Sequence, residues 1–528
     1  MIKDLICALV SSSIYNAAWD ENMAEDCESE TEQAMDVVRS RYARVFGIER
    51  PTVEAVRLVK ILSVLLPSFA ASFQISTTFW MIYIAESLGN GDYFAGLTFV
   101  GILVVIQMAI QTALDYPTGA LGDWIGQRYV ISSALLCYAV AFYLSSMIVA
   151  DTPAPLWIYV TIYALFGLGS SQESGAFNAW FDNNYRVAMP HDKDRKQYGV
   201  FQGRLGMVWQ VSSTLVLLPG SWLAFLYGET WVFTLQAFFA LFLALIVFRL
   251  VRDLPGVRDE DERPSLREYG ALLKDGFKFL GSSRFVTLII FGEVVMFSIG
   301  PVWWNLILFP LYFSFLVTMV AVSAFRTLVF VPQAFANERS GVLAKRFEPK
   351  KWIPRFRILQ FMGVVFYLAL AAIVHFFPGI PAGTDPSTVE FLTIVIPFTN
   401  LPLIEIPVQT VIPVALLFTV FVALNMFGAI AGILTQRVMI DVIPNRIRNS
   451  MYSLQPTLVM LMSMPLMLFY GWLIPLSGFT LPFLISAIIS VFSVLMIWSA
   501  FKNPIPKAEE LVPATKKERE EVQEMDVT

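Results

Sequence analysis

Charged side chains are scarce in this sequence. Asp, Glu, Lys and Arg make up only 15% of its 528 residues, whereas about a quarter of the residues in a soluble domain are charged. Hydrophobic residues reach 56%, and the mean hydropathy is +0.63. This composition excludes an ordinary soluble protein and predicts one that resides in a lipid bilayer. The formal net charge of −5 is small and says little. As partners we expect the lipid bilayer, a small-molecule solute and protons, and no nucleic acid.

Cysteine and histidine are also rare. The three cysteines (Cys7, Cys27 and Cys137) form no CxxC pair, and the histidines are His191 and His375. These counts argue against a disulfide framework or a metal centre, so we expect no metal and no other cofactor. The motifs HExxH, GxSxG and GxxxxGK[ST] are absent. We therefore predict neither an enzyme nor ATP-driven transport.

Long apolar runs fill most of the chain. A bilayer core about 30 Å thick requires about 20 apolar residues in a helix. The sequence predicts twelve such spans, at roughly 60–85, 93–114, 130–150, 155–180, 199–226, 230–250, 284–308, 314–336, 356–377, 411–437, 450–474 and 479–501.

Positive charge is sorted between the two sides of these spans. Apart from Arg204 and Arg326, which fall within spans, the lysines and arginines lie in or beside the tails, the central loop and the loops after even-numbered spans. The loops on the other side near 86–92, 151–154, 227–229, 309–313, 378–410 and 475–478 contain none. The positive-inside rule then places both termini in the cytoplasm, and we expect a multi-pass protein of the plasma membrane.

The order of these segments predicts five regions. They are a cytoplasmic tail (1–57), a six-helix bundle (58–252), a charged linker (253–283), a second bundle (284–501) and a cytoplasmic tail (502–528). Apolar residues recur at near-helical spacing from Val37 to Phe46. This pattern fits either an interfacial amphipathic helix or a helix packed on the cytoplasmic ends of the bundle.

The insert at 378–410 in the second bundle contains two β-branched, apolar runs, 391–398 and 403–408. They predict a short extracellular β-hairpin that caps the bundle, with Pro397 and Pro407 limiting its pairing. An apolar stretch without regular structure is the alternative.

A sequence motif lies between the second and third spans, in what we expect to be a short loop. Its distinctive residues are Asp115, Pro117, Gly119, Gly122, Asp123, Gly126 and Arg128. A degenerate copy returns 222 residues later, with Gly341, Lys345 and Lys350. The repetition predicts two equivalent halves, as in many secondary transporters.

The first motif resembles the signature between helices 2 and 3 of the major facilitator superfamily, with Gly122 in place of the usual Ala and Gln127 in place of a basic residue. The resemblance implies an all-α polytopic fold of twelve transmembrane helices in two pseudo-symmetric six-helix bundles. It also implies a conformational latch, in which Asp123 contacts the N-terminus of helix 11 near 448–450 and Arg128 adds a charged partner. Lys345 replaces the aspartate in the second copy, so the latch is expected in one half only.

Four charged residues within the spans are candidates for proton coupling: Glu173, Arg204, Glu293 and Arg326. Charges at such depth are costly and are often functional. Because neighbouring spans carry them, Glu173 could meet Arg204, and Glu293 could meet Arg326. A permanent salt bridge in each case is the alternative.

Amide and aromatic side chains in the spans predict a cavity for a moderately polar or amphipathic solute. The candidates are Gln74, Gln107, Gln111, Asn178, Gln210, Trp304 and Asn305. An aromatic belt is the alternative for Trp304. Three further charges, Asp182, Arg437 and Asp441, are expected to form a structural network at the ends of spans 4 and 10.

The sequence thus predicts a monomeric secondary transporter that moves a small organic solute by alternating access, with proton-coupled efflux as the leading hypothesis. A nutrient symporter or a uniporter competes with efflux, because the helix-5 motif of proton antiporters survives only as Pro219–Gly220. A non-transporting receptor or a lipid scramblase on the same fold is the alternative from another class.

Overall fold

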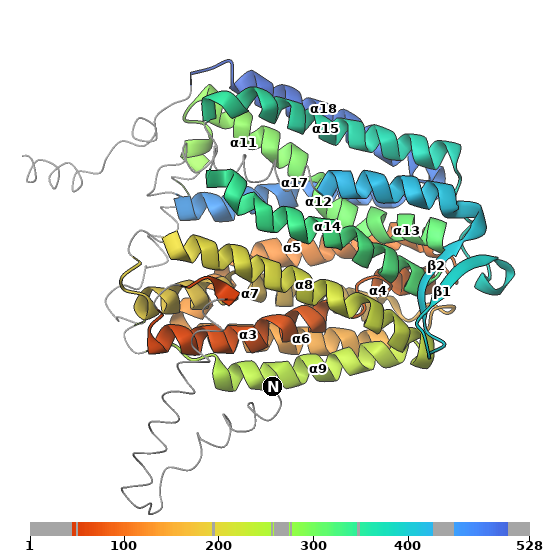
Figure 1. Ribbon diagram of the computed structural model, residues 1–528, viewed down its shortest axis with the longest axis horizontal. Coiled ribbons are helices and arrows are strands. Elements are labelled where there is room, and N and C mark those ends of the chain that lie inside the picture. The colour runs from red at the N-terminus through yellow and green to blue at the C-terminus, as the bar shows by residue number, and fades with distance from the viewer. Residues whose placement is uncertain are drawn as a thin grey trace, which may run out of the picture.

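The computed structural model describes residues 45–48, 51–192, 196–254, 257, 274, 277–345, 349–425 and 448–504. These residues form long helices and one two-stranded sheet (Figure 1). The helices of the first half are α3 (Val53–Gln74), α4 (Trp80–Leu88), α5 (Tyr93–Ile125), α6 (Gln127–Ser146), α7 (Leu156–Ala188), α8 (Lys196–Tyr227) and α9 (Glu229–Leu250).

The second half begins with one span built from four helical pieces: α11 (Arg284–Phe297), α12 (Ile299–Val302), the π-helix η2 (Trp303–Ile307) and α13 (Leu308–Leu316). The elements that follow are α14 (Met319–Lys345), α15 (Pro349–Phe376), β1 (Phe391–Val395), β2 (Pro402–Pro407), the apolar helical run Val408–Asn425, α17 (Arg448–Ser477) and α18 (Thr480–Ala500).

The described helices account for all twelve predicted spans. Nine are long and apolar enough to cross a membrane, and α14 and α15 contain shorter apolar helices at Met319–Pro332 and Phe361–Phe376. The twelfth is α7, whose 33 residues are long enough to cross although its second half is polar. The prediction of a twelve-helix membrane protein is confirmed.

Local capping fixes where several helices begin. The Thr52 hydroxyl accepts a hydrogen bond from the Ala55 amide (3.1 Å) and so caps α3. The Asp92 carboxylate caps α5 through the Phe94 amide (2.9 Å), and Ser283 caps α11 through the Val286 amide (3.1 Å). Each side chain satisfies an amide that the helix itself leaves unpaired.

The first motif is not a loop, which corrects the expectation from the sequence. Helix α5 continues to Ile125, and α6 starts at Gln127. Gly126 alone joins them, with a φ of 112° that a residue with a side chain rarely adopts. The motif is therefore the last turns of a helix, followed by a one-residue corner.

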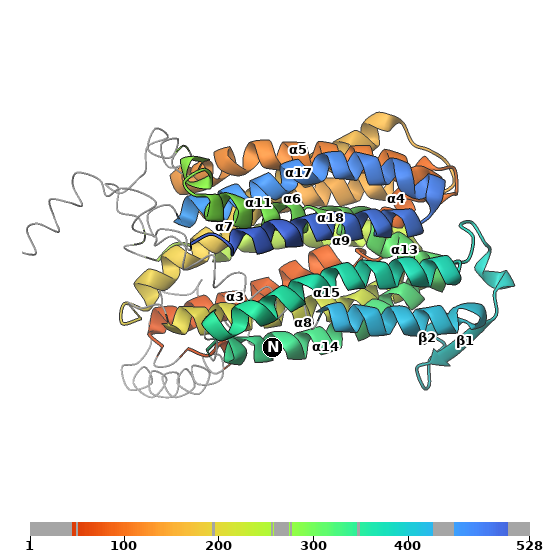
Figure 2. The ribbon, with the colours of Figure 1, turned by 90° about the horizontal axis from the view of Figure 1, so that it is seen from above.

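Helices α3 to α9 form one half and α11 to α18 the other, side by side (Figures 1 and 2). The halves contact each other mainly through two helix pairs, α5 with α17 and α8 with α14. We call the end where α3 begins and α18 stops the tail end, and the opposite end the hairpin end.

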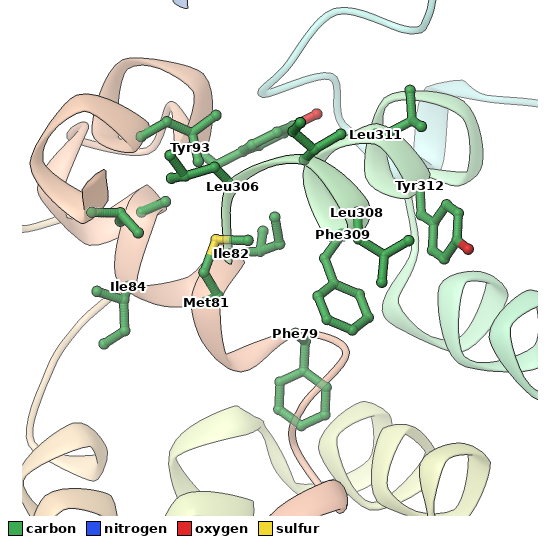
Figure 3. Close-up of a cluster of buried hydrophobic side chains, with 14 of the residues drawn as sticks. Phe79, Met81, Ile82, Ile84, Tyr93, Leu306, Leu308, Phe309, Leu311 and Tyr312 are labelled. Carbon is green, nitrogen blue, oxygen red and sulfur yellow. The ribbon is translucent and has the colours of Figure 1, made fainter. Parts of the chain in front are cut away.

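Among the described residues, the hydrophobic core that both halves share lies at the hairpin end. One cluster there combines side chains of α4 and α5 with side chains of α13 and α14. Figure 3 shows this contact, with Phe79, Met81, Ile82 and Ile84 on one side and Leu306, Leu308, Phe309 and Leu311 on the other. At the tail end, each half has a separate cluster of its own. Packing thus closes the interface at the hairpin end.

The insert between α15 and the helical run Val408–Asn425 forms the predicted β-hairpin. Strands β1 and β2 are antiparallel, with Phe391 opposite Pro407 and Thr393 opposite Glu405, and the register shifts near Val395. The hairpin also reaches the first half, because the indole N–H of Trp222 on α8 donates to the Pro402 carbonyl oxygen (2.7 Å). It ties the two halves together at this end.

Candidate functional site

The first span of each half is interrupted. In the first half, residues 75–79 separate α3 from α4. In the second half, the π-helix Trp303–Ile307 interrupts the corresponding span. Interruptions at equivalent positions of two repeats often mark the binding site of a transporter, and π-helical turns recur at functional sites.

Hydroxyl groups connect the first interruption to the second half. The Thr78 and Ser323 hydroxyls share a hydrogen bond of 2.7 Å, and Ser323 also bonds the Ser221 hydroxyl. All three side chains are buried. We call Thr78, Ser221 and Ser323 the hydroxyl seal, because they join α8, α14 and the start of α4 across the interface.

Arg326 does not pair with Glu293, contrary to the sequence expectation. Its guanidinium lies 3.8 Å from the ring centre of Phe330 and 4.8 Å from that of Trp304. Only 5% of Arg326 is exposed, and its Nε atom has no hydrogen-bond partner. Within the described residues, no ion pair reaches it.

Glu293 is held by an amide instead. The Gln455 side chain on α17 donates to a Glu293 carboxylate oxygen at 2.9 Å, and only 3% of Glu293 is exposed. The sequence identified this buried carboxylate but not its partner, because 162 residues separate the two.

The predicted meeting of Glu173 and Arg204 is also not seen. The exposed Arg204 donates to the Val45 carbonyl oxygen (3.0 Å) at the tail end, and no ion pair joins it to Glu173 in the described part of the chain. Phe46, next to Val45, stacks on Phe201 with ring centres 5.4 Å apart. Residues 45–48 thus pack on the bundle, and the rest of the segment from Val37 to Phe46 lies outside the described residues.

The predicted cavity residues are dispersed along the spans. Gln74, Gln107, Gln111, Gln210 and Asn305 are half-buried, and Trp304 is 48% exposed. Asn305 donates to the Pro301 carbonyl oxygen (2.8 Å) within its own helix. The side chain of Asn178 lies outside the described residues. Trp304 and Asn305 alone among these candidates lie in the π-helix.

The first motif packs tightly against its neighbours. The Thr118 hydroxyl donates to the Ser171 carbonyl oxygen (2.8 Å), which joins α5 to α7. A Cβ on Gly122 would lie 2.3 Å from the Gln127 side chain. Arg128 stacks on Tyr129 and Phe248, at 4.6 and 5.6 Å from their ring centres. The Asp123 side chain lies outside the described residues, so the latch stays a prediction.

Asp182 forms a local ion pair with Arg186, one helical turn away (2.9 Å). Its predicted partners Arg437 and Asp441 lie outside the described residues. In the second motif, Gly341 and Lys345 fall in α14 and Lys350 falls in α15.

Sequence reasoning missed a cavity of about 470 Å³ at the hairpin end. Its wall combines aromatic rings with three carboxylates from different elements: Glu86 of α4, Glu229 of α9 and Glu405 of β2. The Thr318 hydroxyl donates to Glu405 (2.9 Å). Val317, also in the wall, has a φ of 65°, a strained conformation for a β-branched residue. The lack of basic residues in the loops at this end was the signal that could have drawn attention to it.

The Glu86 carboxyl in this wall has a raised pKa. It lies one residue beyond the predicted span 60–85. Burial raises its pKa from 4.5 to about 7, and the negative charges of Glu229 and Asp151 add to the shift. Both effects disfavour the charged form.

Comparison with known proteins identifies a family of membrane proteins. Residues 61–384 match the family model described as Major Facilitator Superfamily. No relative was found among curated protein sequences.

Solved structures of transporters share the fold. The nucleoside transporter NupG has a TM-score of 0.57 and 12% identity, and the match covers 83% of this chain and 100% of NupG. The inward-open xylose transporter XylE from E. coli has a TM-score of 0.54 and 13% identity, covering 88% and 99%. A D-xylose-proton symporter also has a TM-score of 0.54 and 13% identity, covering 85% and 98%.

Proposed function

Because the chain belongs to the major facilitator superfamily, whose members include secondary transporters, we propose that it carries a small organic solute by alternating access, driven by protons through Glu293. The observation that supports alternating access most is the uneven core. Among the described residues, the halves share one hydrophobic cluster at the hairpin end, and the clusters at the tail end each belong to a single half. This asymmetry is the form expected of a two-state carrier closed on one side.

Glu293 is the best-placed proton carrier among the described residues. It is buried in a spanning helix and faces an amide, not a cation. Buried carboxylates of this kind form proton relays in pumps and transporters. A Gln455 side chain can accept a hydrogen bond from the protonated carboxyl or donate to the carboxylate, so either state has a partner.

Uptake is the second candidate for direction. Two of the similar structures are described as a xylose transporter and a D-xylose-proton symporter, and the antiporter motif of helix 5 is mostly absent. With the positive-inside orientation, the tail end faces the cytoplasm and the hairpin lies outside.

Reconstitution in liposomes tests the proposal. We expect a solute from a compound library to dissipate an imposed proton gradient, as reported by a pH-sensitive dye inside the vesicles. Glu293→Gln should abolish this flux and leave solute binding measurable, because Gln keeps the shape but cannot titrate. Glu229→Gln, which replaces a carboxylate at the hairpin end, is the matched control. Undiminished proton flux in Glu293→Gln would contradict the assignment.

A further inference from the structure

Arg326 lies on the face of α14 that meets the first half. Residues three and four apart share one face of a helix, so Ser323, Arg326 and Phe330 lie along one stripe. Ser323 belongs to the hydroxyl seal and contacts Thr78 and Ser221 of the first half. Arg326 is one turn from this seal, toward the tail end, and is therefore at the interface between the halves.

Two aromatic rings lie against the Arg326 guanidinium. Phe330 and Trp304 stack on it at 3.8 and 4.8 Å. A guanidinium has five N–H donors, all of which lie in its plane. The Nε donor has no hydrogen-bond partner, and the Tyr312 hydroxyl lies close enough to interact with the guanidinium. The two rings thus hold the group in place, and its Nε donor is left for a ligand.

The positive charge of Arg326 is not neutralised by any carboxylate in the described residues. Glu293, the predicted partner, is bonded to Gln455. Arginine remains protonated in proteins. An unpaired charge in a membrane span is costly, and such charges are usually functional. Its planar fork matches carboxylates and phosphates, which accept two parallel hydrogen bonds.

We propose that Arg326 binds the anionic group, a carboxylate or a phosphate, of the solute that this transporter carries. The proposal rests on the proposed function and names the substrate class as organic anions. Both helix interruptions converge here, because Thr78 of the first meets Ser323 and Trp304 of the second stacks on Arg326. Trp304 is 48% exposed, so it also offers apolar surface for the body of an aromatic anion.

The sign of the charge changes across the hydroxyl seal. Thr318 and Val320, which precede Ser323 by five and three residues toward the hairpin end, line the cavity that contains Glu86, Glu229 and Glu405. Arg326 lies one turn from Ser323 in the opposite direction. An anion is therefore favoured on the tail side of the seal and disfavoured on the hairpin side.

Binding of small probes to the purified full-length protein tests the proposal. Isothermal titration compares benzoate and phenyl phosphate with the neutral benzamide and the cationic benzyltrimethylammonium. We expect the two anions to bind about 10- to 100-fold more tightly than benzamide, as hydrogen bonds to a charged group imply.

Two substitutions of Arg326 and one control substitution then test whether this residue forms the site. Arg326→Gln should reduce benzoate affinity to that of benzamide, and Arg326→Lys should keep part of it, since lysine retains the charge but not the fork. Arg249→Gln removes an exposed arginine of α9 and should leave benzoate affinity unchanged. Equal affinities for benzoate and benzamide in the wild-type protein would overturn the proposal, even if the Arg326 variants do not fold. So would unchanged benzoate affinity in a folded Arg326→Gln protein.

Thermal stability in nanodiscs with and without phosphatidylglycerol distinguishes a lipid phosphate from a soluble organic anion as the ligand. If that lipid alone raises the thermal stability of the wild type and not of Arg326→Gln, the site holds a lipid phosphate, and the organic-anion substrate class is wrong. Anion binding without proton-driven transport in liposomes would refute the proposed function and leave the site standing. Proton-driven transport of an uncharged solute that does not depend on Arg326 would refute the anion site and leave the proposed function standing.

Discussion

At the scale of single residues, the most specific expectation concerns Asp123 and the predicted conformational latch. If its carboxylate contacts the N-terminus of α17, Asp123→Asn should weaken closure of the tail end by about 0.3–1 kcal/mol and slow transport without unfolding the protein. Solute flux in liposomes measures the effect. Asp182→Asn, which removes the ion pair with Arg186, should transport at nearly the wild-type rate. Equal rates for the wild type and Asp123→Asn would refute the latch.

Because the pKa of Glu86 is raised, we predict that the stability of the protein depends on pH. The closed structure holds this carboxyl protonated up to about pH 7, whereas its ordinary pKa is 4.5. Its contribution to stability is therefore complete below about pH 4.5 and is lost as the pH rises through about 7. Melting temperatures should fall between about pH 5 and pH 8, and the fall should be smaller in Glu86→Gln.

The control for Glu86 is Glu390→Gln, a change at an exposed carboxylate of the same end. It should reproduce the wild-type pH profile. An unchanged profile in Glu86→Gln would show that this carboxyl does not determine the dependence.

At the scale of elements, the β-hairpin of the second half contacts the first half. Its contact with the first half is the hydrogen bond from Trp222 to Pro402. Trp222→Phe keeps an aromatic ring but removes the donor, so the contact should weaken by about 0.5–1.5 kcal/mol. We expect faster proteolysis of residues 391–407 in right-side-out vesicles.

Trp231→Phe provides the comparison for Trp222→Phe, because Trp231 is 43% exposed and stacks on Tyr227 away from the hairpin. Its proteolysis should match that of the wild type. Similar cleavage rates in all three proteins would mean that packing of β2 on α13 and α14, not the indole, holds the hairpin.

At the scale of the whole molecule, closure of the hairpin end depends on close approach of α5 and α17. A Cβ on Gly101 would lie 3.1 Å from the Met467 carbonyl oxygen and 3.3 Å from the Gly471 Cα. Gly101→Leu should therefore push the two helices apart and favour opening at this end. A cysteine placed at Val320 in the hairpin-end cavity should then react faster with a membrane-impermeant maleimide.

Gly363→Leu is the matched control, since a Cβ there meets nothing within 4 Å. It should leave the labelling rate of the Val320 cysteine unchanged. If Gly101→Leu labels no faster than this control, the contact of α5 with α17 does not limit opening.

The sequence alone determined the membrane class, the twelve spans and the hairpin. Each of these depends on local composition: the length of apolar runs, the β-branched runs of the insert, and the residues that cap or break helices. The sequence also identified Glu293 and Arg326 as unusual, because a charge in an apolar run is visible without any structure. It misjudged the first motif, since a helix that continues through Asp115–Ile125 and turns at one glycine resembles a loop when read by composition.

Only the tertiary structure decided which buried groups meet. Thr78 and Ser323 are 245 residues apart, and Glu293 and Gln455 are 162 apart. Such contacts depend on how the two halves pack and on the face that each helix presents, and neither can be read from the spacing along one span. The expectation that charges on neighbouring spans would pair was wrong for this reason. Packing gave Glu293 an amide partner and placed Arg326 against two aromatic rings.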